Sequence, residues 1–140
     1  MKYLLDTNVF REIGKTSPHE NVAAWLRTID DAELAISVIT VREIAKGIAK
    51  LGKTKPQKAI ELEHVVTAIL NAFEGRTLPV DRKVAEIWGK ILGESDKHVD
   101  DVGLAATAQV HRLIVVTRNV RDFAGRGVQL IDPFKPVKRI

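Results

Sequence analysis

Short apolar runs alternate along this chain with longer segments in which apolar residues recur at helical spacing. The runs read as buried strands, and they lie at 2–5, 34–39, 78–80, 113–116 and 128–131. Helical spacing occupies the stretches between them, at 22–29, 40–51, 62–73, 84–92 and 100–110. A chain that alternates strands and helices in this way predicts an α/β protein with a mainly parallel central sheet and helices on both of its faces.

Local signals place the ends of several helices. Residues 17–20, Ser-Pro-His-Glu, read as a capping box with proline at the first helical position. Thr40 opens the next helix, and Gly52 ends it. After a basic turn the chain continues into a second long helix, so 40–73 predicts a helical hairpin. The long apolar stripe on this hairpin fits either a dimer interface or ordinary core packing.

Composition narrows the class of protein. The 140 residues, 45% of them hydrophobic and 29% charged, fit one soluble domain over 1–140 with a basic tail at about 135–140. The absence of cysteine excludes disulfides and thiolate metal sites. No apolar run approaches the ~20 residues of a membrane span, so we expect a cytoplasmic protein without a membrane partner. A net charge of +4 is compatible with a polyanionic ligand.

Four acids fall near the predicted carboxyl ends of strands, where parallel α/β sheets bind ligands: Asp6, Glu43, Asp101 and Asp122. Carboxylates brought together repel one another unless a cation neutralises them. Oxygen ligands without cysteine or a histidine pair suit Mg²⁺ or Mn²⁺. Such an ion could position a phosphodiester and activate a water molecule for its hydrolysis.

Each acid also has a purely local explanation. Asp6 fits a helix N-cap, and Glu43 completes a capping box with Thr40. Asp101 and its neighbour Asp100 both suit the positive end of a helix dipole, although one of them would suffice. Asp122 fits a turn. His98 fits either a residue that supports the acids or an exposed side chain.

Four segments in order resemble the PIN-domain family, and most closely its VapC and FitB-like toxins of type II bacterial toxin–antitoxin pairs: 4–9, 40–44, 101–108 and 116–123. The resemblance implies a three-layer α/β/α fold. It also implies an endoribonuclease toxin that depends on Mg²⁺ or Mn²⁺ and hydrolyses RNA with a metal-activated water. The expected partners are an RNA substrate, an antitoxin protein and a second copy of the chain, with a larger toxin–antitoxin assembly as a further option.

The same resemblance assigns roles to individual residues. It makes Asp6 and Asp101 the core metal ligands, with Glu43 as the third acid. The fourth position falls to Asp122 or, through its carbonyl oxygen, to Asn119. Gly103 departs from the family pattern, which usually has a larger apolar residue there. Candidate substrate-binding residues at the same edge are Thr7, Asn8, Arg118, Asn119 and Arg121.

Two other functions compete with this interpretation. A haloacid-dehalogenase-like phosphatase is suggested by the Asp6 loop, but that chemistry needs a second carboxylate where this chain has Asn8. A non-catalytic module that binds nucleic acid or a protein partner is the other alternative. The presence of Asp6, Glu43 and Asp101 together argues against it, since an inactive site has no need of all three.

Overall fold

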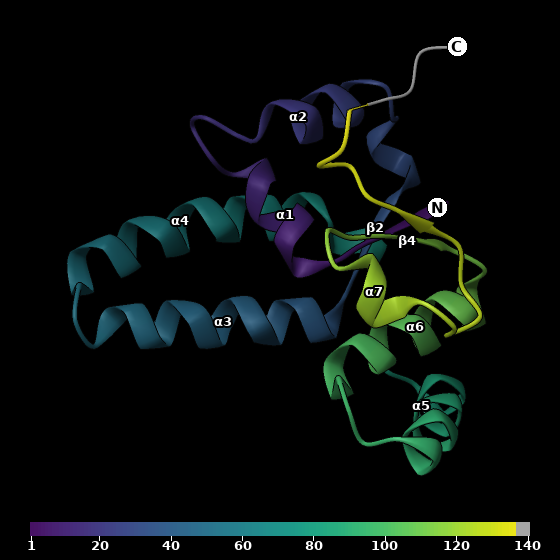
Figure 1. Ribbon diagram of the computed structural model, residues 1–140. Helices are drawn as coiled ribbons and strands as arrows, with labels where there is room; N and C mark the ends of the chain where they lie inside the picture. The colour runs from purple at the N-terminus through teal and green to yellow at the C-terminus, as the bar shows by residue number, and fades with distance from the viewer. Residues whose placement is uncertain (137–140) are drawn as a thin grey trace.

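A five-stranded sheet forms the centre of the molecule (Figure 1). The computed structural model describes residues 1–136. The strands are β1 (Tyr3–Leu5), β2 (Leu34–Ser37), β3 (Thr77–Leu78), β4 (Ile114–Val116) and β5 (Leu130–Ile131). They lie in the order β3-β2-β1-β4-β5, and all four pairings are parallel. The predicted α/β architecture is confirmed, and β1 occupies the middle of the sheet.

Helices cover both faces of this sheet, which gives the predicted three layers. On one face lie α1 (Thr7–Ile13), α2 (Glu20–Arg27) and α4 (Pro56–Ala72). On the other lie α6 (Val99–His111) and α7 (Val120–Phe123), with α5 (Arg82–Glu94) packed against α6. Between them runs α3 (Val38–Gly52), and two 3-10 turns, Asp31–Glu33 and Glu74–Arg76, lead into β2 and β3.

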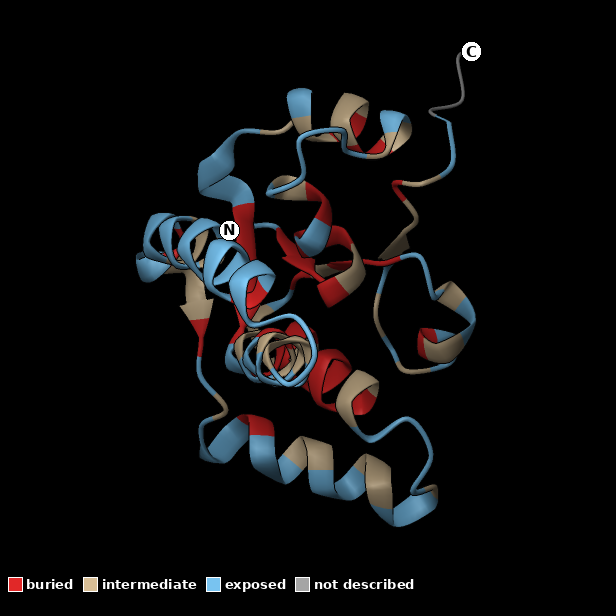
Figure 2. Ribbon diagram, turned by 90° about the vertical axis from the view of Figure 1, so that its left-hand side faces the viewer, coloured by how far each residue is buried: buried red, intermediate tan, exposed pale blue. Residues whose placement is uncertain are grey.

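The alternation of side chains along β1 explains why the sheet needs both layers. Tyr3 and Leu5 point into one apolar cluster, and Leu4 points into the other. All three are buried, because β1 has a neighbouring strand on each side and helices above and below. Figure 2 shows the same arrangement, with buried residues concentrated in the sheet at the centre of the molecule.

The second strand is shorter than predicted, and this moves the start of α3. β2 ends at Ser37, whose hydroxyl accepts a hydrogen bond from the Ile39 N–H at 3.0 Å and so caps the helix. The predicted start at Thr40 is therefore wrong, and Thr40 does not form a capping box with Glu43. The apolar run at 34–39 predicted a strand that was too long, because Ile39 is buried as part of α3 and not as part of β2.

The predicted capping box at 17–20 is also wrong. The helix α2 begins at Glu20, and His19 is its N-cap, with Nδ1 accepting from the Asn21 N–H at 3.2 Å. The His19 N–H in turn donates to Glu12 Oε1 at 2.8 Å, so a tertiary contact with α1 sets the start of the helix. Pro18 lies outside α2 and is exposed.

The predicted helical hairpin is present as α3 and α4, which pack along each other and extend away from the sheet (Figure 1). Three apolar residues of α4 are exposed to solvent: Ile60, Leu62 and Val65. Over residues 1–136, no helix has the length and apolar character needed to cross a membrane. Of the predicted basic tail, positions 137–140 lie outside the described residues.

Gly103 lies where α6 packs closely against α5 and α3. A Cβ there would lie 2.7 Å from Ile39 Cδ1 and 2.7 Å from Trp88 Cζ2. Trp88, on α5, therefore occupies the space that a larger side chain on α6 would need. The departure from the family pattern noted above thus has a steric explanation, since Trp88 approaches the backbone of α6 closely only because residue 103 has no side chain.

Replacing Gly103 by leucine should destabilise the fold by about 1–3 kcal/mol or more, because the added atoms overpack a buried contact. Urea unfolding measures the change. The control is Gly89→Ala on the exposed side of α5, where nothing lies within 4 Å of the added Cβ. That change should stabilise by up to about 1 kcal/mol through helix propensity. Equal stability of Gly103→Leu and the parent chain would contradict the packing argument.

Candidate active site

Asp6 lies where the central strand leaves the core. It follows β1 directly and caps α1, accepting a hydrogen bond from the Thr7 N–H on Oδ1 at 2.7 Å. Its other oxygen, Oδ2, accepts from the Thr117 hydroxyl at 2.7 Å and from Asn8 Nδ2 at 3.3 Å. The carboxylate is only 5% exposed. Asp6 can therefore be both a helix N-cap and a site residue, because one carboxylate oxygen caps α1 and the other accepts from Thr117 and Asn8.

Glu43 comes to the same place from α3. It lies in the second turn of that helix and is half-buried, and its Oε2 accepts a hydrogen bond from the Thr7 hydroxyl. Because Ser37 caps α3, Glu43 has no capping role. Thr7 thus connects two of the predicted acids, donating its backbone N–H to Asp6 and its hydroxyl to Glu43.

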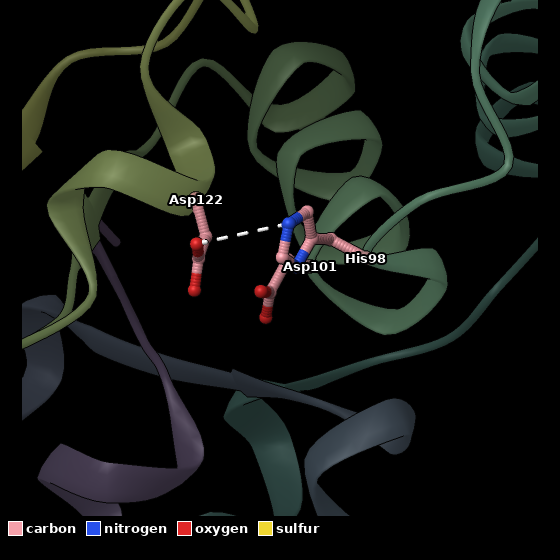
Figure 3. A group of neighbouring side chains, drawn as sticks. All are labelled: His98, Asp101 and Asp122. Atoms are coloured by element: carbon pink, nitrogen blue, oxygen red, sulfur yellow. Dashed lines mark ion pairs between the residues drawn. The ribbon is translucent and has the colours of Figure 1, made fainter.

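Asp101 and Asp122 approach from the opposite layer, together with His98 (Figure 3). One ligand atom from each of the three lies within 4.8 Å of the others. His98 precedes α6, Asp101 is in its first turn, and Asp122 is on the short helix α7 after β4. The His98 Nε2 and Asp122 Oδ1 atoms are 3.9 Å apart. Asp122 is therefore directed at the acids rather than serving only as a turn residue.

Charge repulsion and burial act together on these carboxylates. The pKa of Asp101 is raised to about 6, chiefly by burial and then by the charges of Asp6 and Asp122, while His98 opposes the shift. Burial also raises the pKa of Asp6, against the hydrogen bonds from Thr117, Thr7 and Asn8 that lower it. The pKa of Glu43 is raised by burial and by the neighbouring acids Asp100 and Asp6. The acids therefore share one electrostatic environment.

The paired acids at the start of α6 have separate roles. Asp100 Oδ2 forms an ion pair with Arg42 Nη2 at 2.5 Å, which links α6 to α3 at the rim of the site. Asp101 faces the other acids. Neither acts as a side-chain cap, because the N-cap of α6 is His98 and has no capping hydrogen bond from its side chain.

The predicted substrate-binding residues lie near this edge, but several have internal contacts. Asn8 Oδ1 accepts from the Arg118 N–H at 3.2 Å, which joins the loops after β1 and β4. The Arg118 guanidinium lies 4.7 Å from the centre of the Phe134 ring. Asn119 is exposed at the N-cap of α7, and Arg121 is exposed within that helix. Their roles toward a substrate stay predictions.

Thr117 is a positioning residue that was not among the predicted site residues. Its fully buried hydroxyl donates to Asp6 and accepts from the Asn119 N–H at 2.9 Å, so it fixes both the central acid and the loop after β4. In the sequence, the feature that could have indicated this role is a hydroxyl residue immediately after the most apolar strand of the chain. Thr117 faces the end of β1 only because β1 and β4 are neighbouring strands.

Comparison with known proteins places this arrangement in a family. A model of the PIN domain matches residues 3–126, and the chain belongs to that family. The toxin FitB of Neisseria gonorrhoeae is 35% identical, over 94% of this chain and 97% of the relative. The VapC ribonuclease Y4jK of Sinorhizobium fredii is 33% identical, over 95% of this chain and 98% of the relative.

Solved structures agree. The structure of FitAB bound to the IR36 DNA fragment superposes with a TM-score of 0.83 and 34% identity, covering 99% of each chain. DNA-bound VapBC of Salmonella typhimurium gives a TM-score of 0.68 and 27% identity, over 95% of this chain and 98% of that one. The predicted membership of the PIN-domain family, close to its VapC and FitB-like toxins, is confirmed.

Replacing Thr117 by valine should lower the free energy of unfolding by about 1–3 kcal/mol, because it removes a donor from a buried carboxylate. Thr117→Ser, which keeps the hydroxyl, is the matched control and should retain most of the stability. Urea unfolding at neutral pH measures both variants. If the valine and serine variants unfold alike, the hydroxyl has no positioning role.

The raised pKa of Asp101 predicts how stability depends on pH in the metal-free protein. Its ordinary value is 3.8 and its value in the fold is about 6, so folding favours the neutral acid. The stabilisation from this residue is complete below pH 3.8 and is lost as the pH rises through about 6. Asp101→Asn cannot ionise, so its advantage in melting temperature over the parent chain should grow between pH 4 and pH 7.

Differential scanning calorimetry across that pH range, with a chelator present, measures this difference. The titration of the other acids is common to both proteins and largely cancels when their curves are subtracted. A difference that is flat with pH would show that Asp101 is not destabilised by its neighbours.

Proposed function

We propose that this protein is an endoribonuclease toxin of a type II toxin–antitoxin module, dependent on Mg²⁺ or Mn²⁺. The observation that supports it most is the acidic site at one edge of a PIN-domain sheet, where burial and like charge raise the pKa values of three carboxyl groups. The names of its relatives, a toxin and VapC ribonucleases, point to the same activity. Such an enzyme would act in the cytoplasm, where its RNA substrate lies.

The residues fit a divalent cation. Clustered carboxylates with raised pKa values are held in an unfavourable state that a positive ion would relieve. Their oxygens are the ligands that Mg²⁺ and Mn²⁺ take in proteins. Asp6, Glu43, Asp101 and Asp122 would hold the ion, and Asn119 could supply a carbonyl oxygen. When bound, the ion would lower the pKa of a water molecule and polarise the scissile phosphate.

The protein's own side chains would orient the reaction. Three hydrogen-bond donors hold the Asp6 carboxylate in one orientation, so it would fix the position of the reacting groups relative to the protein. Glu43 is held by Thr7, and its raised pKa suits it to orient and accept a proton from the attacking water. Attack on phosphorus would leave a 5′-phosphate and a 3′-hydroxyl. Arg121, exposed nearby, could contact phosphate oxygens of the RNA.

An antitoxin and a second copy of the chain are the proposed protein partners. Similar solved structures include FitAB and VapBC bound to DNA and a toxin–antitoxin complex from Klebsiella pneumoniae. The hairpin helices and α1 line an open, mainly apolar pocket of about 410 Å³. Leu62 and Val65 of α4 form part of its wall and are exposed to solvent, as is Ile60 on the same helix. An apolar surface of this kind is typical of interfaces that are covered in the working assembly.

Replacing Asp101 by asparagine should abolish RNA cleavage, a fall of at least about 10²-fold, while leaving the fold intact. The matched control is Asp31→Asn, the same chemical change at an exposed position near the amino end of β2, which should cleave normally. The assay follows fragments of total RNA by sequencing their ends, with circular dichroism to check folding. Full activity in Asp101→Asn would remove this residue from the mechanism.

The same proteins test the metal. Millimolar Mg²⁺ or Mn²⁺ should raise the melting temperature of the parent chain and of Asp31→Asn, because an ion bound only by the native state stabilises it. The shift should be much smaller in Asp101→Asn. Equal shifts in all three would indicate that the ions bind elsewhere.

A further inference from the structure

Within residues 1–136, the His98 side chain makes an ion pair with Asp122 but no hydrogen bond, so the backbone sets its place at the acidic site. It adopts the left-handed conformation, with φ 55° and ψ 51°, at the start of α6, and its side chain does not cap the helix. Glycine and asparagine adopt this conformation more readily than histidine does. The next residue is anchored, since the Trp88 indole N–H donates to the Val99 carbonyl at 2.9 Å. The segment therefore fixes the position of the His98 backbone at the start of α6.

The imidazole faces two carboxylates from different elements (Figure 3). His98 and Asp101 are three residues apart at the start of α6, a spacing that brings side chains to one face of a helix. Asp122 approaches from α7, with its Oδ1 3.9 Å from His98 Nε2. A ligand atom of each lies within 4.8 Å of the others, which leaves room for an ion between them at ordinary coordination distances.

We propose that His98 is a metal ligand in addition to the acids, and that it makes the site select Mn²⁺ over Mg²⁺. The inference rests on the proposed function, because it concerns the ion that the same carboxylates would hold. The expected ligand set on this side of the site is one imidazole nitrogen and the carboxylates of Asp101 and Asp122.

Ligand chemistry supplies the reason for selectivity. Mg²⁺ demands oxygen ligands in a near-ideal octahedron and keeps much of its water. Mn²⁺ shares the carboxylate ligands of Mg²⁺ but is a transition metal, the weakest binder of the first-row series, for which nitrogen is also a ligand. An imidazole nitrogen among the carboxylates would therefore shift the preference of the site from Mg²⁺ toward Mn²⁺.

The competing explanation is that His98 only forms an ion pair with Asp122 and shields the acids from one another. An ion pair would neutralise charge in the empty site and would be displaced when a cation binds. A ligand would instead remain next to the bound ion. The two explanations predict opposite spectroscopic results.

Pulsed electron paramagnetic resonance on the full chain loaded with Mn²⁺ tests the proposal directly. A coordinated imidazole should give a ¹⁴N coupling to the manganese electrons. The coupling should be present in the parent chain and absent in His98→Asn, which keeps a residue that tolerates the left-handed conformation. The control is His64→Asn on the exposed face of α4, which should retain the signal.

Isothermal titration calorimetry of the same proteins measures selectivity. Affinity for Mn²⁺ should fall by about tenfold or more in His98→Asn, while affinity for Mg²⁺ changes little. A parent chain that binds Mn²⁺ without ¹⁴N coupling, or one that does not bind Mn²⁺ at all, would overturn the proposal. Equal losses of Mn²⁺ and Mg²⁺ affinity in His98→Asn would also overturn it.

These outcomes are separate from those for the proposed function. RNA cleavage that needs Asp101 but shows no nitrogen coupling would leave the ribonuclease in place and remove His98 as a ligand. A nitrogen-coupled Mn²⁺ site in a protein that does not cleave RNA would support the ligand and contradict the ribonuclease.

Discussion

Mutual repulsion among carboxylates is the constraint on which the rest of the site depends. Asp6 is nearly inaccessible to solvent, and Glu43 and Asp101 are half-buried. The charge of Asp6 raises the pKa of both Glu43 and Asp101, and the charge of Asp122 raises the pKa of Asp6 and of Asp101. A folded chain has to hold these groups together although His98 opposes only part of the repulsion around Asp101. It does so because the surrounding fold is stable enough to tolerate the local cost, as functional sites commonly require.

Hydroxyl and amide donors are the means by which the fold holds the acids. Thr117 and Asn8 donate to one oxygen of Asp6, and Thr7 donates to Asp6 through its backbone and to Glu43 through its hydroxyl. These donors lower the cost of burying a carboxylate, and they also fix its direction. The same hydrogen bonds join the loops after β1 and β4 to α3. They therefore position the acids and also hold this edge of the sheet together.

The two sides of the site differ in how they hold their acids. Asp6 at the start of α1 and Glu43 on α3 accept hydrogen bonds from neighbouring donors. The layer of α6 and α7 supplies Asp101 and Asp122 beside His98, whose imidazole opposes the rise in the Asp101 pKa. Asp101 stands apart in this respect, because its pKa is shifted by burial and by charge alone. The site is thus rigid on one side and electrostatically strained on the other, which is a suitable arrangement for receiving a cation.

Local patterns in the chain were enough to predict a parallel sheet, a helical hairpin and a group of acids at one edge of the sheet. The strands and helices follow from periodicity, which operates over a few residues at a time. The placement of the acids follows from the general rule that parallel strands direct their carboxyl ends to one edge. The resemblance carried by four short motifs also pointed to the PIN-domain family, which the comparisons confirmed.

The starts of α2 and α3, and the residues that support the acids, depend on contacts between distant segments and are visible in the folded structure alone. His19 caps α2 because Glu12 of another helix holds its N–H, and Ser37 rather than Thr40 caps α3 because Ile39 packs into the second apolar cluster. Thr117 meets Asp6 across a separation of 111 residues, and Trp88 fits against Gly103 from a different helix. Contacts of this kind depend on which strands and helices are neighbours, and no local pattern in the chain encodes that.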